Sequence, residues 1–384
     1  MKKKSAKKVL HIVTVSFVIK HFFGNQFKYL TSTTENRYYL ACTPSEELAL
    51  WQNDYNYQQV PIRITRSISP LEDIIAIYKL IKFIKQEKID VVVAHTPKGG
   101  LVGMIAAFVC NIHNRIYFRH GIAYETSKGF KKSLLKNIER ISGYLATKVV
   151  NVSKGVESFA IKDRLNPLYK NLILKKGTCN GVDAMDRFNP QTYSENSVSN
   201  LRNKLNINSE DFVIGYVGRL VHDKGIDELL EAWQNIRVSS NIKLLLVGPF
   251  EDKDAISDLT KKRILLDPKV IFTDYVQDSA LFFRLMNVFV LATYREGFPT
   301  VSLEASSMEL PVIITRATGC EEAIIENETG IFVENDAKSI ENAVNKYLLD
   351  NSLCKKHGIR GRKFVLEYFE QSIIWDTIHN ELGY

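Results

Sequence analysis

Short apolar runs that alternate with helical segments are the feature that most constrains the fold of this chain. The clearest example begins with the apolar run Val288–Ala292 and continues with a helix that starts near Pro299. Val312–Ile314 then reads as the next strand. Continuous apolar runs predict parallel strands, because both faces of a parallel sheet are covered. Since the pattern recurs through both halves, the sequence predicts an α/β protein with two doubly wound domains.

The length of the chain also favours two domains. It has 384 residues, and domains typically contain about 100–200 residues. A polar run at 191–200 completes the boundary between them. We therefore expect an N-terminal domain at residues 1–190 and a C-terminal domain at 191–367.

Two segments of the N-terminal half have patterns that favour core elements. Val9–Ser16 is apolar and follows a basic stretch, as in a signal peptide, but His11 and Thr14 interrupt it and no small-residue cleavage site follows. We expect it to form the first strand. Leu71–Glu87 has apolar residues at the spacing of an amphipathic helix, namely Ile74, Ile77, Tyr78, Ile81 and Ile84.

Two acids and a glycine lie around the start of the helix near Pro299. Glu296 and Glu304 are separated by seven residues, and Gly297 allows close approach of a ligand. Free N–H groups at 300–302 and the helix dipole favour an anion there. Two carboxylates that bind hydroxyls beside an anion site suit a sugar attached to a nucleotide diphosphate. The alternative is a loop acid followed by a carboxylate that merely stabilises the helix dipole.

Two cations follow an apolar run in the second half. The string Gly218-Arg219 precedes Lys224-Gly225, directly after the predicted strand 212–217. A departing nucleoside diphosphate develops negative charge, which two such cations stabilise without a metal ion. Surface cations in ion pairs are the alternative interpretation.

These strings together carry a resemblance to a known family. Glu296-Gly297-Phe298-Pro299 with Glu304 resembles the E-x7-E motif of the retaining glycosyltransferases of family 4, and the Arg219 to Lys224 string resembles that family's phosphate clamp. The resemblance covers the chain from about residue 9 to its last helix. It implies the GT-B fold, in which two Rossmann-like domains face each other across a cleft. It also implies that the last segment, about 368–384, packs back on the first domain.

The resemblance implies roles for individual residues. Glu296 would act at the transferred sugar, His120 would reach that sugar, and Glu304 would bind the ribose hydroxyls. The four residues assigned to catalysis are Glu296, His120, Arg219 and Lys224. The residues assigned to donor binding are Gly218, Gly297, Phe298, Pro299, Thr300, Val301 and Glu304.

The N-terminal domain supplies further candidates for contact with the acceptor or a phosphate. His95, Lys98 and Arg119 lie at or just beyond predicted strand ends, where open α/β sheets bind ligands. The family often has a glycine pair after its first strand. This chain has Gly24 and Asn25 in that loop instead, which also argues against a G-x-G-x-x-G dinucleotide site.

The expected substrates follow from the resemblance, and no cofactor is expected. The donor would be a nucleotide sugar, with UDP expected because uridine is the commonest base in such families, and the enzyme would be a hexosyl- or N-acetylhexosaminyltransferase. Five scattered cysteines without a C-x-x-C pair, and no Asp-x-Asp string at a strand end, predict no metal. No nucleic-acid-binding module is recognisable. The alternatives are a nucleotide-sugar epimerase on the same fold and a non-catalytic protein that binds a nucleotide sugar or a phospholipid.

The distribution of charge indicates an anionic partner for the first half. Residues 1–190 carry +16 and the remainder −8, within a net charge of +8. The predicted helix Ser127–Leu145 concentrates lysines on one side, as helices at anionic lipid surfaces do. We expect a cytoplasmic enzyme that contacts the inner face of the plasma membrane and extends a polyprenyl-diphosphate-linked glycan for a surface polysaccharide or glycoconjugate. A soluble saccharide acceptor, with the lysines merely solvated, is the alternative.

Overall fold

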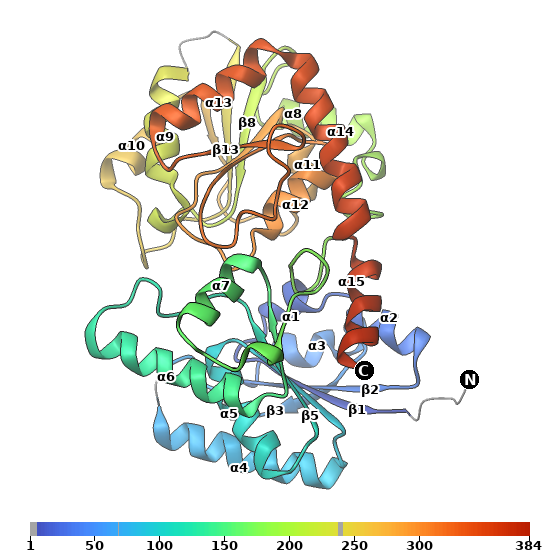
Figure 1. The fold of residues 1–384 in the computed structure, drawn as a ribbon. Coiled ribbons are helices and arrows are strands. Elements are labelled where there is room, and N and C mark those ends of the chain that lie inside the picture. The colour runs from blue at the N-terminus through green and yellow to red at the C-terminus, as the bar shows by residue number, and fades with distance from the viewer. Residues whose placement is uncertain (1–5, 68, 237–240) are drawn as a thin grey trace. The chain divides into compact units, whose positions relative to one another are not determined.

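The computed structural model describes residues 6–67, 69–236 and 241–384. It divides into two compact units (Figure 1). Unit 1 comprises residues up to Asn180 together with Gln371–Tyr384, and unit 2 comprises Gly181–Glu370. Each unit is built on one parallel sheet with helices on both faces, as the alternation of apolar runs predicts.

Unit 1 contains a seven-stranded parallel sheet in the order β3-β2-β1-β4-β5-β6-β7. The strands are β1 (Lys8–Ile12), β2 (Arg37–Cys42), β3 (Gln58–Pro61), β4 (Val91–His95), β5 (Asn114–Arg119), β6 (Lys148–Asn151) and β7 (Asn171–Leu172). Val9–Ser16 was predicted to contain the first strand, and β1 confirms this. Successive residues of β1 enter different cores: Val9 lies in one cluster and Leu10 in the other, because side chains of a strand alternate between faces.

Two groups of helices cover the two faces of this sheet. The helices are α1 (Val18–Phe22), α2 (Gln26–Thr33), α3 (Glu46–Tyr55), α4 (Pro70–Glu87), α5 (Pro97–Val109), α6 (Gly129–Leu145) and α7 (Lys154–Lys162), with a 3-10 turn at Leu168–Lys170. Helix α5 packs between α4 and α6 over one face (Figure 1). Helices α1, α2 and α3 contribute side chains to the core on the other face.

Helix α4 forms where it was predicted, but its apolar positions are not all buried. Of the apolar positions that gave the helical spacing, Ile84 is buried, whereas Ile74 and Tyr78 are 64% and 67% exposed. The other buried positions of the helix are Ala76 and Leu80. The helix is apolar on more than one side, so its periodicity alone does not determine which side packs on the sheet.

Unit 2 contains a six-stranded parallel sheet in the order β10-β9-β8-β11-β12-β13. The strands are β8 (Phe212–Val217), β9 (Ile242–Val247), β10 (Val270–Phe272), β11 (Val288–Leu291), β12 (Val312–Thr315) and β13 (Gly330–Val333). The helices are α8 (Glu195–Lys204), α9 (Ile226–Ile236), α10 (Asp258–Leu266), α11 (Ala280–Phe283), α12 (Thr300–Ser307), α13 (Ala337–Leu349) and α14 (Asn351–Tyr368), with 3-10 turns at Pro190–Thr192 and His222–Lys224. A single core holds both faces of this sheet.

The division between the units differs from the expected boundary at residue 190. Residues 181–190 belong to unit 2, because Val182 donates a backbone hydrogen bond to the carbonyl of Phe369 and Phe188 is buried in the unit 2 core. Arg362 of α14 also bonds the carbonyl oxygen of Phe188 at 3.2 Å. The polar run at 191–200 therefore does not mark the boundary; most of it forms α8 and the turn before it.

The C-terminal segment belongs to unit 1. It contains α15 (Gln371–Thr377) and a π-helical turn (Ile378–Leu382), both shown in red in Figure 1. The indole of Trp375 donates to the Asn180 side-chain oxygen at 2.7 Å, and the Tyr29 hydroxyl donates to Asp376 at 2.9 Å. Among the described residues, no helix is long and apolar enough to cross a membrane.

Candidate functional site

The two cations and Glu296 lie at one edge of the unit 2 sheet. Strands β8 and β11 are parallel neighbours, so the loops that follow them leave the sheet at the same edge. Gly225 has a φ of +67°, and a Cβ atom there would overlap the carbonyl oxygen of Ala292, just after β11. Only glycine therefore permits the turn after Lys224 to pack against the chain that leads to Glu296.

Lys224 and Glu296 form an ion pair. The Lys224 Nζ atom contacts the Glu296 Oε1 atom, and the two side chains are only 20% and 15% exposed. A partly enclosed pair is less screened than a surface pair, so each charge fixes the position of the other. The pair confirms that the sequence strings at 218–225 and 296–304 lie together in the fold.

Arg219 is held by a different acid. Its guanidinium lies 2.6 Å from the Glu251 carboxylate, in a loop after β9, and both side chains are substantially exposed. Glu251 was not among the predicted residues. Arg295, which was also missed, lies 2.7 Å from Asp223. The sequence could have indicated Glu251 and Arg295, since each closely follows an apolar strand. Nothing in the sequence indicates which cation pairs with which acid.

The start of α12 offers fewer free N–H groups than predicted. Thr300 donates to the carbonyl of Phe298 at 3.0 Å, and Ser302 donates to that of Pro299 at 2.9 Å. The expectation of three free donors at 300–302 is therefore wrong, because the chain turns tightly at Pro299 and bonds to itself. A turn at Gly319 closes over the same loop: its φ is +83°, and a Cβ atom would collide with the carbonyl oxygen of Glu296.

Glu304 projects from the first turns of α12 into a partly buried environment. Burial raises the pKa of this carboxyl to about 7, Arg187 opposes the shift, and Asp278 adds to it. Arg187 itself lies 2.9 Å from Asp278. No hydrogen bond to the Glu304 side chain is found among the described residues. A carboxyl with its pKa near neutrality, in a site that contains other charged groups, is typical of a functional position.

In unit 1, three histidines form a connected row. His120 Nε2 lies 3.0 Å from His95 Nδ1, and His95 Nε2 lies 3.3 Å from His11 Nδ1. The ring of His120 stacks on Phe22, with centroids 3.9 Å apart and an interplanar angle of 5°. Burial lowers the pKa of His120 to about 3, which keeps its ring neutral at physiological pH. The role of His120 stays a prediction, and His11 was not among the predicted residues.

The structure corrects the prediction for Arg119. This side chain is fully buried, and its guanidinium bonds Glu139 at 3.1 Å, Asn151 at 3.0 Å and Asn166 at 3.1 Å. A group enclosed in this way cannot reach an acceptor or a phosphate. The sequence places Arg119 at the end of β5, but the register of that strand points it between the sheet and α6.

Lys98, Gly24 and Asn25 are the remaining predicted candidates. Lys98 is 8% exposed and lies 2.5 Å from Asp73 of α4, so its ammonium already has an anionic partner. Gly24 adopts a φ of +49° in the turn between α1 and α2, and Asn25 precedes α2 without capping it through its side chain. Roles for these three residues in binding a ligand stay predictions.

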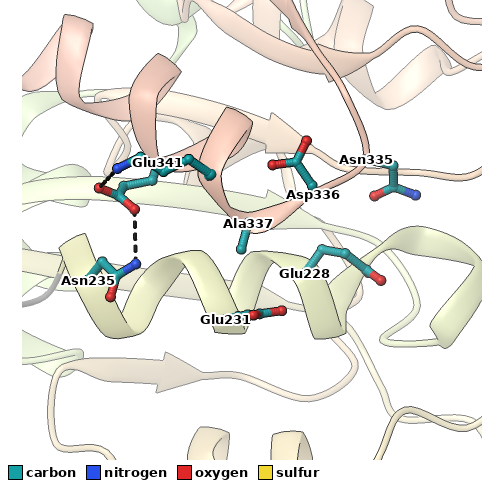
Figure 2. A pocket seen from close by; sticks show the side chains of 8 residues that line it. Glu228, Glu231, Asn235, Asn335, Asp336, Ala337 and Glu341 are labelled. Carbon is teal, nitrogen blue, oxygen red and sulfur yellow. Dashed lines mark hydrogen bonds and ion pairs between the residues drawn. The ribbon is translucent and has the colours of Figure 1, made fainter.

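An acidic hollow in unit 2 is separate from the residues just described. It lies between α9 and the start of α13, and Figure 2 shows Glu228, Glu231, Asp336 and Glu341 around it. Asn235 donates to Glu341 at 2.9 Å, the bond drawn in Figure 2. An acidic lining repels a diphosphate, so the hollow does not suit the donor. Among the described residues, no group of three or more His, Cys, Asp or Glu side chains is arranged so that it could hold a metal ion.

Two family descriptions match the chain, one in each half. A family described as "Glycosyl transferase 4-like" matches residues 11–153, and one described as "Glycosyl transferases group 1" matches residues 197–364. The chain is also 34% identical over 376 residues to a capsular polysaccharide biosynthesis glycosyltransferase, CapM, of Staphylococcus aureus. That match covers 97% of this chain and 96% of the relative.

A second relative is more distant and has a more specific name. It is the UDP-Gal:alpha-D-GlcNAc-diphosphoundecaprenol alpha-1,3-galactosyltransferase of Escherichia coli, 28% identical over 288 residues, or 73% of this chain and 72% of the relative.

Solved structures with the same fold include a glycosyltransferase from Rickettsia africae and the HepE protein of Anabaena in complex with UDP. The first has a TM-score of 0.82 at 19% identity, with 99% of this chain and 98% of the other covered. The second has a TM-score of 0.80 at 17% identity, with 98% and 99% covered. The predicted GT-B fold is confirmed, and the chain belongs to the group 1, family 4-like glycosyltransferases of bacterial polysaccharide biosynthesis.

Proposed function

We propose that this glycosyltransferase moves a sugar, with retention of its anomeric configuration, from a UDP-sugar to a growing glycan on a polyprenyl diphosphate. The observation that carries the proposal is the Lys224–Glu296 ion pair at the sheet edge that Arg219 also borders. The named acceptor of the Escherichia coli relative and the UDP in HepE support the substrate classes.

The charges at this edge suit the proposed transfer. The bond between the anomeric carbon and the β-phosphate oxygen breaks, and the acceptor oxygen bonds to that carbon. The acceptor's proton leaves with the nucleoside diphosphate, whose negative charge Arg219 and Lys224 stabilise. Glu296 holds Lys224 in position and binds a hydroxyl of the sugar. The family resemblance assigns Glu304 to the ribose, whose two hydroxyls can donate hydrogen bonds to its carboxylate.

A panel of nucleotide sugars, each incubated with a membrane extract of lipid-linked glycans, tests the proposal. We expect one UDP-sugar to release nucleotide, with release that depends on the acceptor. No release with any donor, or conversion of the donor sugar to its epimer without acceptor, would contradict it. Product anomers determined by NMR test retention.

We expect turnover without a divalent metal, because the proposed site provides two cations for the leaving group. The rate should be the same within about twofold when EDTA is added. Loss of activity in EDTA, with recovery on addition of manganese, would show that this expectation is wrong.

The pKa of Glu304 gives an expected pH dependence for donor binding. When the pH is below the Glu304 pKa of about 7, most of this carboxyl is protonated, and a protonated carboxyl accepts hydroxyl hydrogen bonds poorly. The Kd for the UDP-sugar should therefore decrease about tenfold for each unit by which the pH is raised toward 7. Above pH 7 it should level off. Calorimetric titration at several pH values measures this.

A matched pair of variants isolates Glu304 from other groups that titrate. Glu304→Gln should bind the donor weakly at every pH, with no slope. Glu334→Gln, at an exposed acid of the same unit, should keep the slope. An unchanged slope in Glu304→Gln would show that another group causes it.

Exposed side chains of unit 1 favour peripheral contact with the cytoplasmic face of a membrane. Phe130 at the start of α6 is 83% exposed, and Lys131 and Lys132 follow it in the exposed face. On α4, Leu71, Ile74, Ile75 and Tyr78 are all more than half exposed and share one side of the helix. Apolar side chains beside lysines suit an anionic lipid surface, where each lysine contributes about 1 kcal/mol.

Co-sedimentation with vesicles tests this contact. The protein should bind vesicles with anionic lipid at low salt, release at high salt, and bind neutral vesicles weakly. Phe130→Ser together with Ile74→Ser should weaken binding by about tenfold or more. Leu349→Ser, at a leucine of unit 2 that is 86% exposed, should have no effect. Equal binding by both variants would contradict the assigned surface.

A further inference from the structure

His11, His95 and His120 lie on three neighbouring strands of unit 1. His11 is in β1, His95 is the last residue of β4, and His120 directly follows β5. These strands are adjacent in the order β1-β4-β5, which places the three imidazoles in a row. Only His120 reaches the surface, because His11 is fully buried and His95 is 3% exposed. The row therefore leads from the core to one partly exposed ring.

Neutral imidazoles can connect in this row in only two ways. Each neutral ring has one N–H donor and one acceptor nitrogen, and His95 uses both nitrogens, at 3.0 and 3.3 Å from its neighbours. The hydrogen bonds must therefore all run in the same direction. Either every bond points from His11 toward His120, or every bond points from His120 toward His11.

The surroundings of the two inner rings favour the neutral state. The rings packed around His11, apart from His95, are Phe23, Phe27, Tyr38 and Tyr384. No carboxylate contacts His11 or His95 among the described residues. Burial accordingly lowers the pKa of His11 to about 3 and that of His95 well below its ordinary value, with the neighbouring histidines adding to the shift of His95.

The buried end of the row favours one direction. His11 Nε2 has no hydrogen-bond partner among the described residues. If the bonds pointed inward, this nitrogen would carry a buried N–H without an acceptor, which folded proteins rarely tolerate. If they point outward, it carries only a lone pair. His11 then donates from Nδ1 to His95, His95 donates from Nδ1 to His120 Nε2, and the proton of His120 is on Nδ1.

We propose that His11 and His95 are positioning residues that hold His120 as its Nδ1–H tautomer, so that His120 donates a hydrogen bond to a sugar oxygen of the substrate. The stacking of His120 on Phe22 fixes the ring plane, and the bond from His95 fixes its rotation. No described residue bonds His120 Nδ1, so this donor is free for a ligand. Only the identity of the ligand rests on the proposed function.

Long-range proton–nitrogen NMR of the protein labelled with ¹⁵N-histidine tests the tautomer directly. The ring correlations distinguish a protonated nitrogen from an unprotonated one, and His120→Gln identifies the signals of His120. We expect His120 to be protonated on Nδ1 and His11 to be unprotonated on Nε2. A wild-type His120 that is protonated on Nε2 would overturn the proposal.

Two substitutions at His11 separate the hydrogen bond from packing. His11→Phe keeps a ring among the aromatic side chains that surround His11 but loses the N–H that donates to His95. His120 should then become a mixture of tautomers. Turnover should fall on the order of tenfold, because the residue that orients a functional histidine is lost, while KM for the donor stays within about twofold. His11→Asn retains a side-chain N–H near the position of Nδ1 and should restore both the spectrum and turnover.

A buried histidine elsewhere supplies the control. His357 of unit 2 bonds the Tyr347 hydroxyl at 2.8 Å, and His357→Phe should leave the His120 signals unchanged. An unchanged His120 spectrum in His11→Phe would overturn the proposal that His11 sets the tautomer of His120. The tautomer is measured without substrate. Failure to find any sugar transfer would therefore contradict the proposed function but not the assignment of His11 and His95 as the residues that hold the His120 tautomer.

Discussion

Replacement of Lys224 by methionine is expected to lower kcat by about 100- to 1,000-fold, and replacement of Arg219 by methionine should have an effect of the same order. A preorganised charge at a developing anion contributes about 3–4 kcal/mol to transition-state stabilisation. Lys224 should be the more sensitive, because its variant also leaves the partly buried Glu296 carboxylate without its cation. Nucleotide release under single-turnover conditions measures the effect on the chemical step.

Arg316 provides a control with closely matched geometry. Its ion pair with Glu326 has the same 2.6 Å separation as the Arg219–Glu251 pair, and the exposed fractions are 52% and 33% against 54% and 37%. Arg316→Met should therefore lose the same kind of surface ion pair but retain turnover within about twofold. Wild-type rates in both Lys224→Met and Arg219→Met would refute the phosphate assignment.

Replacement of Arg119 by methionine should destabilise unit 1 by about 3–5 kcal/mol, because it leaves a buried carboxylate without its cation. Arg119 and Glu139 are both 0% exposed, and the carboxylate also accepts hydrogen bonds from Tyr117 at 3.0 Å. Burial already raises the pKa of Glu139. Urea unfolding, followed by fluorescence with a separate signal for each unit, should show the unit 1 transition at a lower urea concentration.

Two further variants show whether the charge is the cause. The double variant Arg119→Met with Glu139→Leu removes both ions and should recover most of the lost stability, since buried pairs often exchange for apolar groups at little cost. Lys338→Ala, which removes a 70% exposed cation from its pair with Glu341, should change the free energy of unfolding by less than about 1 kcal/mol. A destabilisation by Arg119→Met no larger than this would contradict the account of the network.

The strand–helix alternation and the two donor-side strings could be predicted because their signals are local, and the GT-B fold followed from the family resemblance that those strings carry. Apolar runs such as Val288–Leu291 mark buried strands without knowledge of their neighbours. Glu296 and Lys224 also could be expected to meet, since parallel strands place their following loops at one edge of a sheet. Periodicity was insufficient where a helix has two apolar sides, as the exposed Ile74 and Tyr78 of α4 show.

The partners of charged and titratable groups were decided only by the tertiary structure. By sequence position, Arg119 ends a strand, His120 directly follows it, and the two look equally available. In the structure Arg119 is enclosed by Glu139 and two asparagines, whereas His120 remains partly exposed. His11 lies far along the chain from His95 and carried no signal of its own. Sequence determines which chemical groups exist and which local elements carry them. Their burial and partners depend on side chains distant in sequence, so the charge, pKa and hydrogen-bonding role of each group appear only after the chain has packed.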